Sequence, residues 1–154
     1  MPVELSTDAD ASFAAAEMVM RALPQWFELE EPLVEFAEAA RTSPTFIARE
    51  EAGVVGFLTL KRQTPLAAEI LAMGVLPKRH RHGLGRELVE AACAFALGQG
   101  ARLLQVKTLG PSHPSEHYAR TRAFYEALDF VPLEETTSVW GPSNPCLILV
   151  RALS

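Results

Sequence analysis

The sequence of 154 residues contains little cysteine and no long apolar run. Its two cysteines, Cys93 and Cys146, lie in the apolar stretches AACAFAL and PCLILV, without a CxxC partner or a histidine-rich neighbourhood. This pattern excludes a disulfide framework and a zinc site, so we expect two buried thiols and no metal. No apolar run approaches the ~18–20 residues that a membrane-spanning helix needs, so we expect no membrane partner.

Basic residues are also scarce, with 14 Lys and Arg against 19 Asp and Glu and a net charge of −5. A surface with this balance repels nucleic acid, and we expect no nucleic-acid partner. The first residues, MPVELSTDADASF, lack the basic region and apolar core of a signal peptide, which favours a cytoplasmic protein. The length predicts one domain over residues 1–154 with one hydrophobic core.

Hydrophobic periodicity, together with proline and glycine punctuation, predicts the element order ααβββαβαββ. Thr7 or Asp8 caps the first helix, and Pro32 lies in the first turn of the second. The expected helices cover 7–23, 32–41, 84–97 and 115–130, the last running into a strand; the expected strands cover 45–50, 53–62, 67–76, 102–109, 130–135 and 146–153. The segments 67–76, 84–97 and 102–109 form a parallel βαβ unit. We therefore predict a mixed α/β (α+β) fold, with a central mixed β-sheet and helices on both faces.

A basic segment, VLPKRHRHGLGREL, links the third predicted strand to the next helix. Within nine residues it contains four cations, Lys78, Arg79, Arg81 and Arg86, and it also contains Gly83 and Gly85. The start of a helix leaves backbone N–H groups unpaired at the positive end of its dipole. Glycines there allow an oxyanion to approach those groups closely, so the segment predicts a phosphate-binding turn.

Two nucleotide-binding motifs do not fit this turn. The sequence has no P-loop string GxxxxGK[ST], and a dinucleotide fingerprint would need a glycine where Leu88 stands. The segment V75-L-P77-K-R-H80-R-H-G83-L-G85 instead resembles the acyl-coenzyme A loop of the GNAT N-acetyltransferase superfamily, V-x-P-x-x-(Q/R)-x-x-G-x-(G/A). One position departs from the pattern, because His80 stands where Gln or Arg is usual.

A second stretch strengthens the resemblance. The sequence RAFYEALDF, 122–130, is similar to the later F-Y-x-x-x-G-F motif of the superfamily, and the element order from 44 to 151 also matches. Tyr118 stands where many members have Asn, and Asp129 replaces the usual Gly. Asp tolerates a left-handed backbone better than most residues, so we expect the turn to be kept.

The resemblance implies an acetyl-CoA-dependent N-acetyltransferase that transfers an acetyl group directly to a primary amine in a ternary complex. Strands 67–76 and 102–109 would separate and leave a cleft at their carboxyl ends. The backbone of the first strand would bind the pantetheine arm, and the amides of the turn would bind the diphosphate. The implied cofactor-binding residues are Met73, Gly74, Val75, His80, Arg81, His82, Gly83, Leu84, Gly85, Arg86 and Tyr118.

Acetyl transfer needs a neutral amine and a proton for the leaving thiolate. Tyr125 occupies the tyrosine position of the later motif and is the candidate acid; alternatively it packs as a wall residue. The resemblance to the strand of histone-type acetyltransferases makes Glu69, six residues before Val75, the candidate base. A water chain could replace it, and Glu69 could instead point to water at the strand's open end. Alternation places Glu69, Leu71 and Met73 on one strand face.

We expect the acceptor to be a small-molecule or peptide amine. Its site would involve the loop SVWGPSNP and a mouth formed by Trp26, Phe27, Glu28, Glu30 and Glu31, which could equally be an ordinary helix connection. His113 and His117 face the acceptor or are plain surface residues. Two other functions stay open: an acyl-CoA-binding module without catalysis, and an interaction domain whose exposed strand edge pairs with a partner. The terminal strand CLILV could also form a homodimer.

Overall fold

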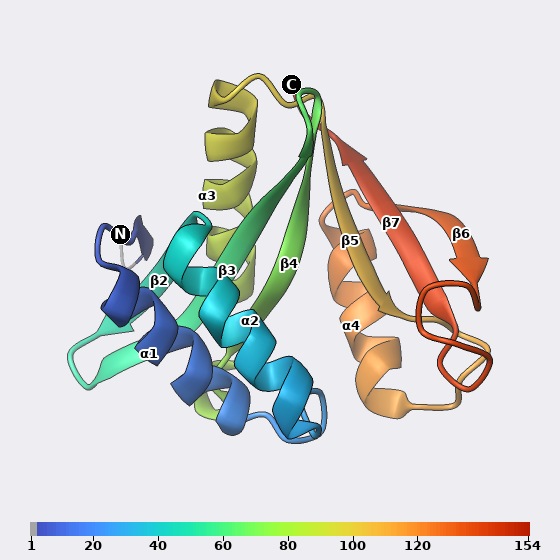
Figure 1. The fold of residues 1–154 in the computed structure, drawn as a ribbon, viewed down its shortest axis with the longest axis horizontal. Helices are drawn as coiled ribbons and strands as arrows, with labels where there is room; N and C mark the ends of the chain where they lie inside the picture. Colours follow the sequence, from blue (N-terminus) through green and yellow to red (C-terminus); the bar gives the residue numbers. More distant parts are fainter. Residues whose placement is uncertain (1–2) are drawn as a thin grey trace.

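In the computed structural model, which describes residues 3–154, a seven-stranded sheet lies between two layers of helices (Figure 1). The strand order across the sheet is β1-β2-β3-β4-β5-β7-β6. In chain order the elements are β1 (Val3–Leu5), α1 (Ala9–Arg21), α2 (Glu30–Thr42), β2 (Thr45–Glu50), β3 (Gly53–Thr64), β4 (Ala67–Val75), the short 3₁₀ helix η1 (Pro77–Arg79), α3 (Leu84–Gly98), β5 (Leu103–Leu109), α4 (Glu116–Ala127), β6 (Val131–Thr136) and β7 (Cys146–Ala152).

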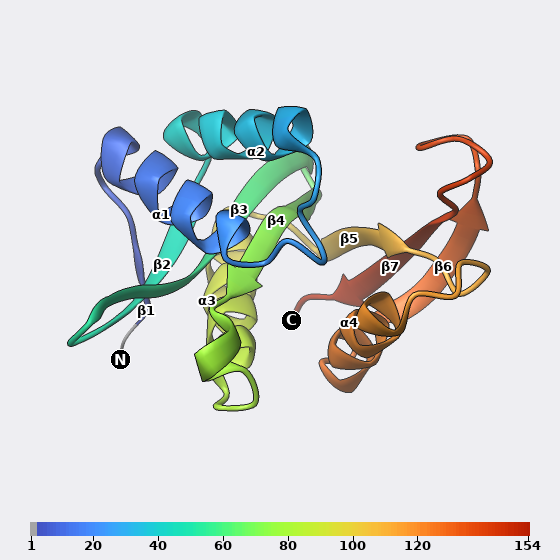
Figure 2. The same cartoon turned by 90° about the horizontal axis from the view of Figure 1, so that it is seen from below.

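The predicted mixed sheet with helices on both faces is confirmed. Helices α1 and α2 cover one face of the sheet, whereas α3 and α4 cover the other (Figure 2). Two local signals are also confirmed: the side chain of Asp8 caps α1 by accepting from two backbone amides, and Asp129 adopts a left-handed φ of 69° after α4. The structure adds β1 and η1 to the predicted order.

Two hydrophobic clusters hold the layers together. Residues such as Val19, Ala37 and Phe57 pack between the sheet and the pair α1 and α2. Leu88 and Leu104 belong to the larger cluster, which lies under α3 and α4. Burial of these apolar side chains is the main stabilising contribution to such a fold, at about 25 cal/mol per Å² of apolar surface.

Strands β4 and β5 are parallel neighbours only at their beginnings, which confirms the βαβ unit. Their pairing runs from Ala67 opposite Leu103 to Ile70 opposite Val106. Strand β4 continues to Val75 and β5 to Leu109 without pairing to each other. The two strands therefore part beyond Ile70, as predicted, and Figure 1 shows them diverging from a common end.

A bulge in β4 lies at this point of separation. In the ladder with β3, Thr59 pairs with Ala72 and Leu60 pairs with Ile70, so Leu71 is an extra residue on β4. A bulge of this kind shifts the alternation of side chains by one position.

The bulge corrects the expectation that Glu69, Leu71 and Met73 share one face of the strand. Ile70 packs in the cluster beneath α3 and α4, which places its neighbour Glu69 on the opposite face. Beyond the bulge, Met73 packs against the cluster beneath α3 and α4, whereas Ala72 belongs to the cluster beneath α1 and α2. Glu69 and Met73 therefore lie on opposite faces of the sheet.

Strand β7 is not an edge of the sheet, because it pairs with β5 on one side and with β6 on the other. Within the described residues the edges of the sheet are β1 and β6. The homodimer through CLILV stays a prediction. Both cysteines are buried and free, as predicted. In the described part of the chain no helix has the length and hydropathy to cross a bilayer, and no cluster of three or more potential metal ligands occurs.

Candidate active site

The connection between β4 and α3 is anchored at its base. The ring Nε2 of His80 lies 2.7 Å from the backbone carbonyl oxygen of Val75, to which it donates a hydrogen bond. Arg79 reaches Glu50 at the end of β2, with 2.6 Å between the guanidinium and the carboxylate. The side chain of His80 therefore fixes the loop internally.

Beyond His80 the loop leaves its backbone donors free. Arg81 and Gly83 have φ values of 66° and 81°, and Gly83 precedes α3 without a side-chain cap. Among residues 3–154, the backbone amides of 81–86 have no hydrogen-bond acceptor, and the first amide bonded again is that of Glu87, 3.0 Å from the carbonyl oxygen of Gly83. Such a run of free amides with left-handed residues at a helix start is suited to binding an anion.

The two glycines of the loop have different local roles. A Cβ on Gly83 would meet no atom within 4 Å, so the positive φ is what requires glycine there. A Cβ on Gly85 would lie 3.0 Å from two ring carbons of Phe124, so Gly85 allows α3 and α4 to approach closely.

Beyond Ile70 the edge of β4 that faces β5 is unpaired in the described chain, and every second residue directs its backbone N–H and C=O groups toward that edge. The amide of Leu76 bonds the carbonyl oxygen of Val55 on β3, and in an antiparallel ladder such bonded pairs recur at every second residue. Gly74, paired with Phe57, therefore directs its backbone groups to β3, whereas Met73 and Val75 direct theirs away from β3. Gly74 also leaves room for α1 and the residues that follow it, since a Cβ there would lie 3.1 Å from Val19 and 2.7 Å from Leu23.

Trp26, in the connection between α1 and α2, contacts both α4 and the connection between β4 and α3. Its indole N–H donates to Thr121 on α4 at 3.0 Å, and its carbonyl oxygen accepts a hydrogen bond of 3.0 Å from the hydroxyl of Tyr118. Its ring also packs edge-on against those of His117 and His80, at centroid distances of 5.1 and 6.1 Å. Local sequence patterns carry no signal for these contacts, because their partners are far apart in the chain.

The hydroxyl groups of the two tyrosines of α4 differ in whether they make a hydrogen bond within the protein. The hydroxyl of Tyr118 is engaged by Trp26, and burial raises its pKa. Tyr125 is 5% exposed and packs edge-on against Phe124 and Phe130. Within residues 3–154 its hydroxyl has no hydrogen-bond partner, yet the oxygen is not sealed from solvent. Burial raises the pKa of the Tyr125 hydroxyl, so it stays protonated at neutral pH.

Glu69 is buried, which excludes the alternative that it points into water. Its Oε1 accepts a hydrogen bond of 2.7 Å from Nε2 of Gln105, and Nζ of Lys107 lies 2.9 Å from the same oxygen. The sequence analysis missed both partners on β5. Alternation along RLLQVKTL, with Leu104 and Val106 buried, would have placed Gln105 and Lys107 together on the other face.

Of the residues predicted to form an acidic mouth for the acceptor, some are already engaged within the protein. Glu30 is ion-paired with Arg21 at 2.7 Å, and Trp26 and Phe27 pack beside the cluster beneath α1 and α2. Glu28 and Glu31 are exposed. This arrangement matches an ordinary helix connection more closely than a cation-binding mouth.

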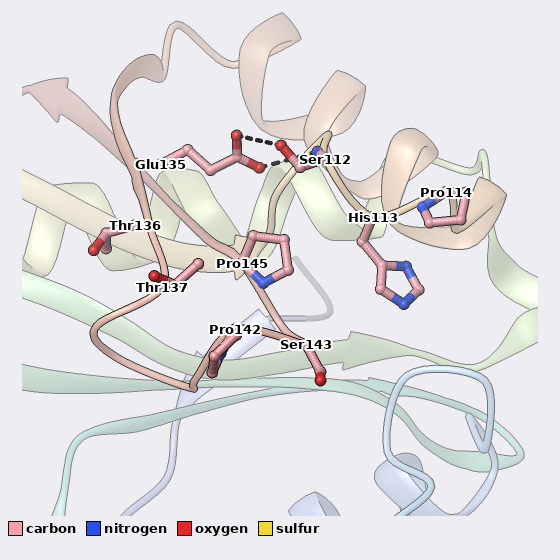
Figure 3. Close-up of a pocket in the computed structure, with 9 residues that line it drawn as sticks. All are labelled: Ser112, His113, Pro114, Glu135, Thr136, Thr137, Pro142, Ser143 and Pro145. Atoms are coloured by element: carbon pink, nitrogen blue, oxygen red, sulfur yellow. Dashed lines mark hydrogen bonds between the residues drawn. The ribbon is translucent and has the colours of Figure 1, made fainter.

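A cavity of about 460 Å³ lies beyond the end of β5, between the β5–α4 and β6–β7 connections (Figure 3). On one side Glu135 accepts hydrogen bonds from the backbone and hydroxyl of Ser112, at 3.0 and 2.8 Å. His113 lines another side, and its buried Nδ1 has no hydrogen-bond partner among the described residues. The predicted acceptor loop SVWGPSNP contributes Pro142, Ser143 and Pro145 to this cavity.

Comparisons with known proteins agree with this geometry. A GNAT-family protein from Desulfovibrio desulfuricans is 19% identical, with a TM-score of 0.83 over 99% of this chain and 98% of its own. An aminoglycoside 6'-N-acetyltransferase complexed with coenzyme A is 15% identical, with a TM-score of 0.77 over 99% and 97% of the two chains. The ribosomal-protein-S18-alanine N-acetyltransferase of Escherichia coli is 17% identical, with a TM-score of 0.76 over 99% and 94%.

At this identity the structural likeness shows the fold alone. A search of curated proteins finds no match. The model of the acetyltransferase (GNAT) family, however, matches residues 13–130, which include the β4–α3 connection and α4. This chain therefore belongs to the GNAT acetyltransferase family.

Proposed function

We propose that the protein is an acetyl-CoA-dependent N-acetyltransferase whose acceptor is a primary amine. The observation that supports this most directly is the run of free amides at residues 81–86, beside the point where β4 and β5 part. The free amides match the diphosphate of an acyl-CoA, and the unpaired edge of β4 matches the amide groups of its pantetheine arm.

The residues of the loop fit this ligand in distinct ways. The amides of 81–86 would bind the diphosphate, and the exposed guanidiniums of Arg81 and Arg86 would add positive charge around it. Met73 and the amide of Val75 would supply the backbone groups for pantetheine, since the carbonyl oxygen of Val75 already accepts from His80. Gly74, Gly85 and His80 support the site through packing and the loop anchor, because their own groups are used within the protein. Tyr118 would act through Trp26.

The reaction is a direct transfer in a ternary complex. The amine nitrogen forms a bond to the carbonyl carbon of the thioester, and the C–S bond breaks as the tetrahedral intermediate collapses. The amine loses a proton, which Glu69 or a water chain ending at Glu69 accepts. The sulfur leaves as the thiolate of coenzyme A, which then takes a proton from water.

Tyr125 is the candidate donor to that sulfur, because its hydroxyl is protonated and has no partner among the described residues. Its raised pKa makes complete transfer to a thiolate, whose own thiol has a pKa near ~8.5, unfavourable. We therefore assign it a hydrogen bond that stabilises the developing negative charge on the sulfur.

The acceptor class stays as broad as a primary amine of a small molecule or a peptide. The structural neighbours include one enzyme named for an aminoglycoside and another named for an alanine of a ribosomal protein. The cavity lined by His113 and Glu135 lies among the loops proposed to receive the acceptor.

The test is a panel of primary amines, both small molecules and peptides, incubated with acetyl-CoA while free thiol is measured. We expect amine-dependent thiol release and an acetylated product by mass spectrometry. Stabilisation of the protein by coenzyme A, with no turnover on any amine, would instead indicate a binding module without catalysis. Absence of any thermal shift with coenzyme A would contradict the proposal at its first step and favour an interaction domain.

A further inference from the structure

Lys107 lies where β4 and β5 separate. Ile70 and Val106 are the last paired residues of these strands, and Lys107 is the next residue on β5. Its Nζ lies 2.9 Å from Oε1 of Glu69, which itself stands opposite Gln105 in the ladder. Lys107 and Glu69 therefore face each other at the point where the strands part.

The pair is largely withdrawn from water. The side chain of Glu69 is 6% exposed and that of Lys107 is 29% exposed. A carboxylate so buried is unfavourable unless a charge or hydrogen bonds compensate it. Lys107 supplies the charge, and Gln105 supplies a hydrogen bond of 2.7 Å to the same oxygen.

The two oxygens of Glu69 are used differently. Both contacts fall on Oε1. Oε2 accepts no hydrogen bond from residues 3–154, and it is not sealed from solvent. One oxygen is thus held in place while the other is free to accept a proton.

We propose that Lys107 is a positioning residue for the transfer reaction. It holds Oε1 and leaves Oε2 to accept the proton of the amine, directly or through a water molecule. This inference rests on the proposed function, because it gives Lys107 a role only where Glu69 accepts a proton.

The other groups around Glu69 are accounted for. Lys61 stands opposite it on β3, but its side chain is exposed and makes no ion pair in the described part of the chain. The neutral thiol of Cys146 on β7 lies close enough to interact with both Glu69 and Lys107, and burial raises its pKa. Within residues 3–154, Lys107 is thus the cation that Glu69 contacts.

The experiment compares K107M and K107R with wild type, and uses K61M as the matched control on the neighbouring strand. We expect K107M to lower kcat about tenfold or more, with an unchanged KM for acetyl-CoA. K107R should recover most of the activity, because it keeps a cation beside Oε1 of Glu69, and K61M should behave like wild type.

The outcomes separate this inference from the proposed function. Inactivity of the wild type on every amine would contradict the proposed function and, with it, any catalytic role for Lys107. An active wild type with an unchanged kcat in K107M would overturn the positioning role alone. An equal loss of kcat in K107M and K107R would also overturn it, because a cation beside Oε1 would then not be what the reaction needs.

Discussion

Gly85, in the first turn of α3, lies directly against the ring of Phe124 on α4. A Cβ at Gly85 would stand 3.0 Å from both Cε1 and Cζ of that ring. The same turn carries the free amides of 84–86, so the position of α4 and the position of the proposed anion site are coupled through this contact.

The contact predicts how G85A behaves. Alanine gains about 1 kcal/mol in helix propensity, but the crowded ring must move, and overpacking costs about 1–3 kcal/mol. We expect G85A to change the free energy of unfolding little and to weaken coenzyme A binding. The double variant G85A/F124L should recover binding, because the smaller side chain makes room. Urea unfolding and calorimetric titration measure both effects, and strictly additive effects would contradict the coupling.

We expect a different result from substitution of Gly83, because there the backbone φ of 81°, and not a close neighbour, is what disfavours a side chain. G83A meets no neighbouring atom but must place a Cβ in a left-handed backbone, at a cost of about 1–2 kcal/mol. We expect lower stability and weaker coenzyme A binding. G98A is the matched control, since Gly98 ends the same helix, has open space and no positive φ. It should bind coenzyme A like wild type; equal loss in both variants would argue against a special loop backbone.

Local sequence signals predicted most of this fold. Asp8 and Asp129 could be placed correctly because a cap and a left-handed turn depend on the residue itself and its neighbours. The three residues of β1 are too few for a periodic signal, and they form a strand only by pairing with β2. The bulge at Leu71 has no glycine or proline at its position to mark it.

The part of the candidate site that lies within one short segment could be predicted from the sequence. The parts formed by residues far apart in the chain could not. The loop motif identified the run of free amides from sequence spacing alone. The partners of Glu69 depend on the register between β4 and β5, which no local pattern contains. The bond from Tyr118 to Trp26 joins residues 92 positions apart, and it occupies the hydroxyl of a tyrosine to which the family resemblance gives a role at the cofactor.

Y125F tests the proposed donor to the sulfur. Removing a hydroxyl that has no partner among the described residues should not lower stability, since no hydrogen bond is lost. We expect a kcat lower by about tenfold or more, with unchanged affinity for acetyl-CoA. Y118F is the contrasting variant: it should lose about 1 kcal/mol of stability, because its hydroxyl bonds Trp26. Full turnover in Y125F would remove Tyr125 from the mechanism.

The position of Trp26 predicts that its fluorescence emission changes when coenzyme A binds. Its ring contacts His80 of the β4–α3 connection and His117 of α4, so a ligand between these elements should change its surroundings. The chain has two tryptophans, and W140F leaves Trp26 alone to report. We expect coenzyme A to change the emission of W140F. W26F, which keeps the 44% exposed Trp140, should respond little; a signal carried by Trp140 would contradict this assignment.

The burial of the two thiols predicts that the free energy of unfolding falls at alkaline pH. Burial raises the pKa of Cys146 and of Cys93 above their ordinary value of 9.0, so the folded protein holds these protons more tightly than the unfolded chain. That contribution is fully present below about pH 9 and falls as the pH rises further, by at most ~1.4 kcal/mol per pH unit for each group. Urea unfolding between pH 7.5 and 10.5 should therefore show declining stability above pH ~9. C146A should be less stable at neutral pH but decline less steeply, because it lacks one of the two thiols. A slope identical to that of wild type would show that Cys146 does not titrate as its burial requires.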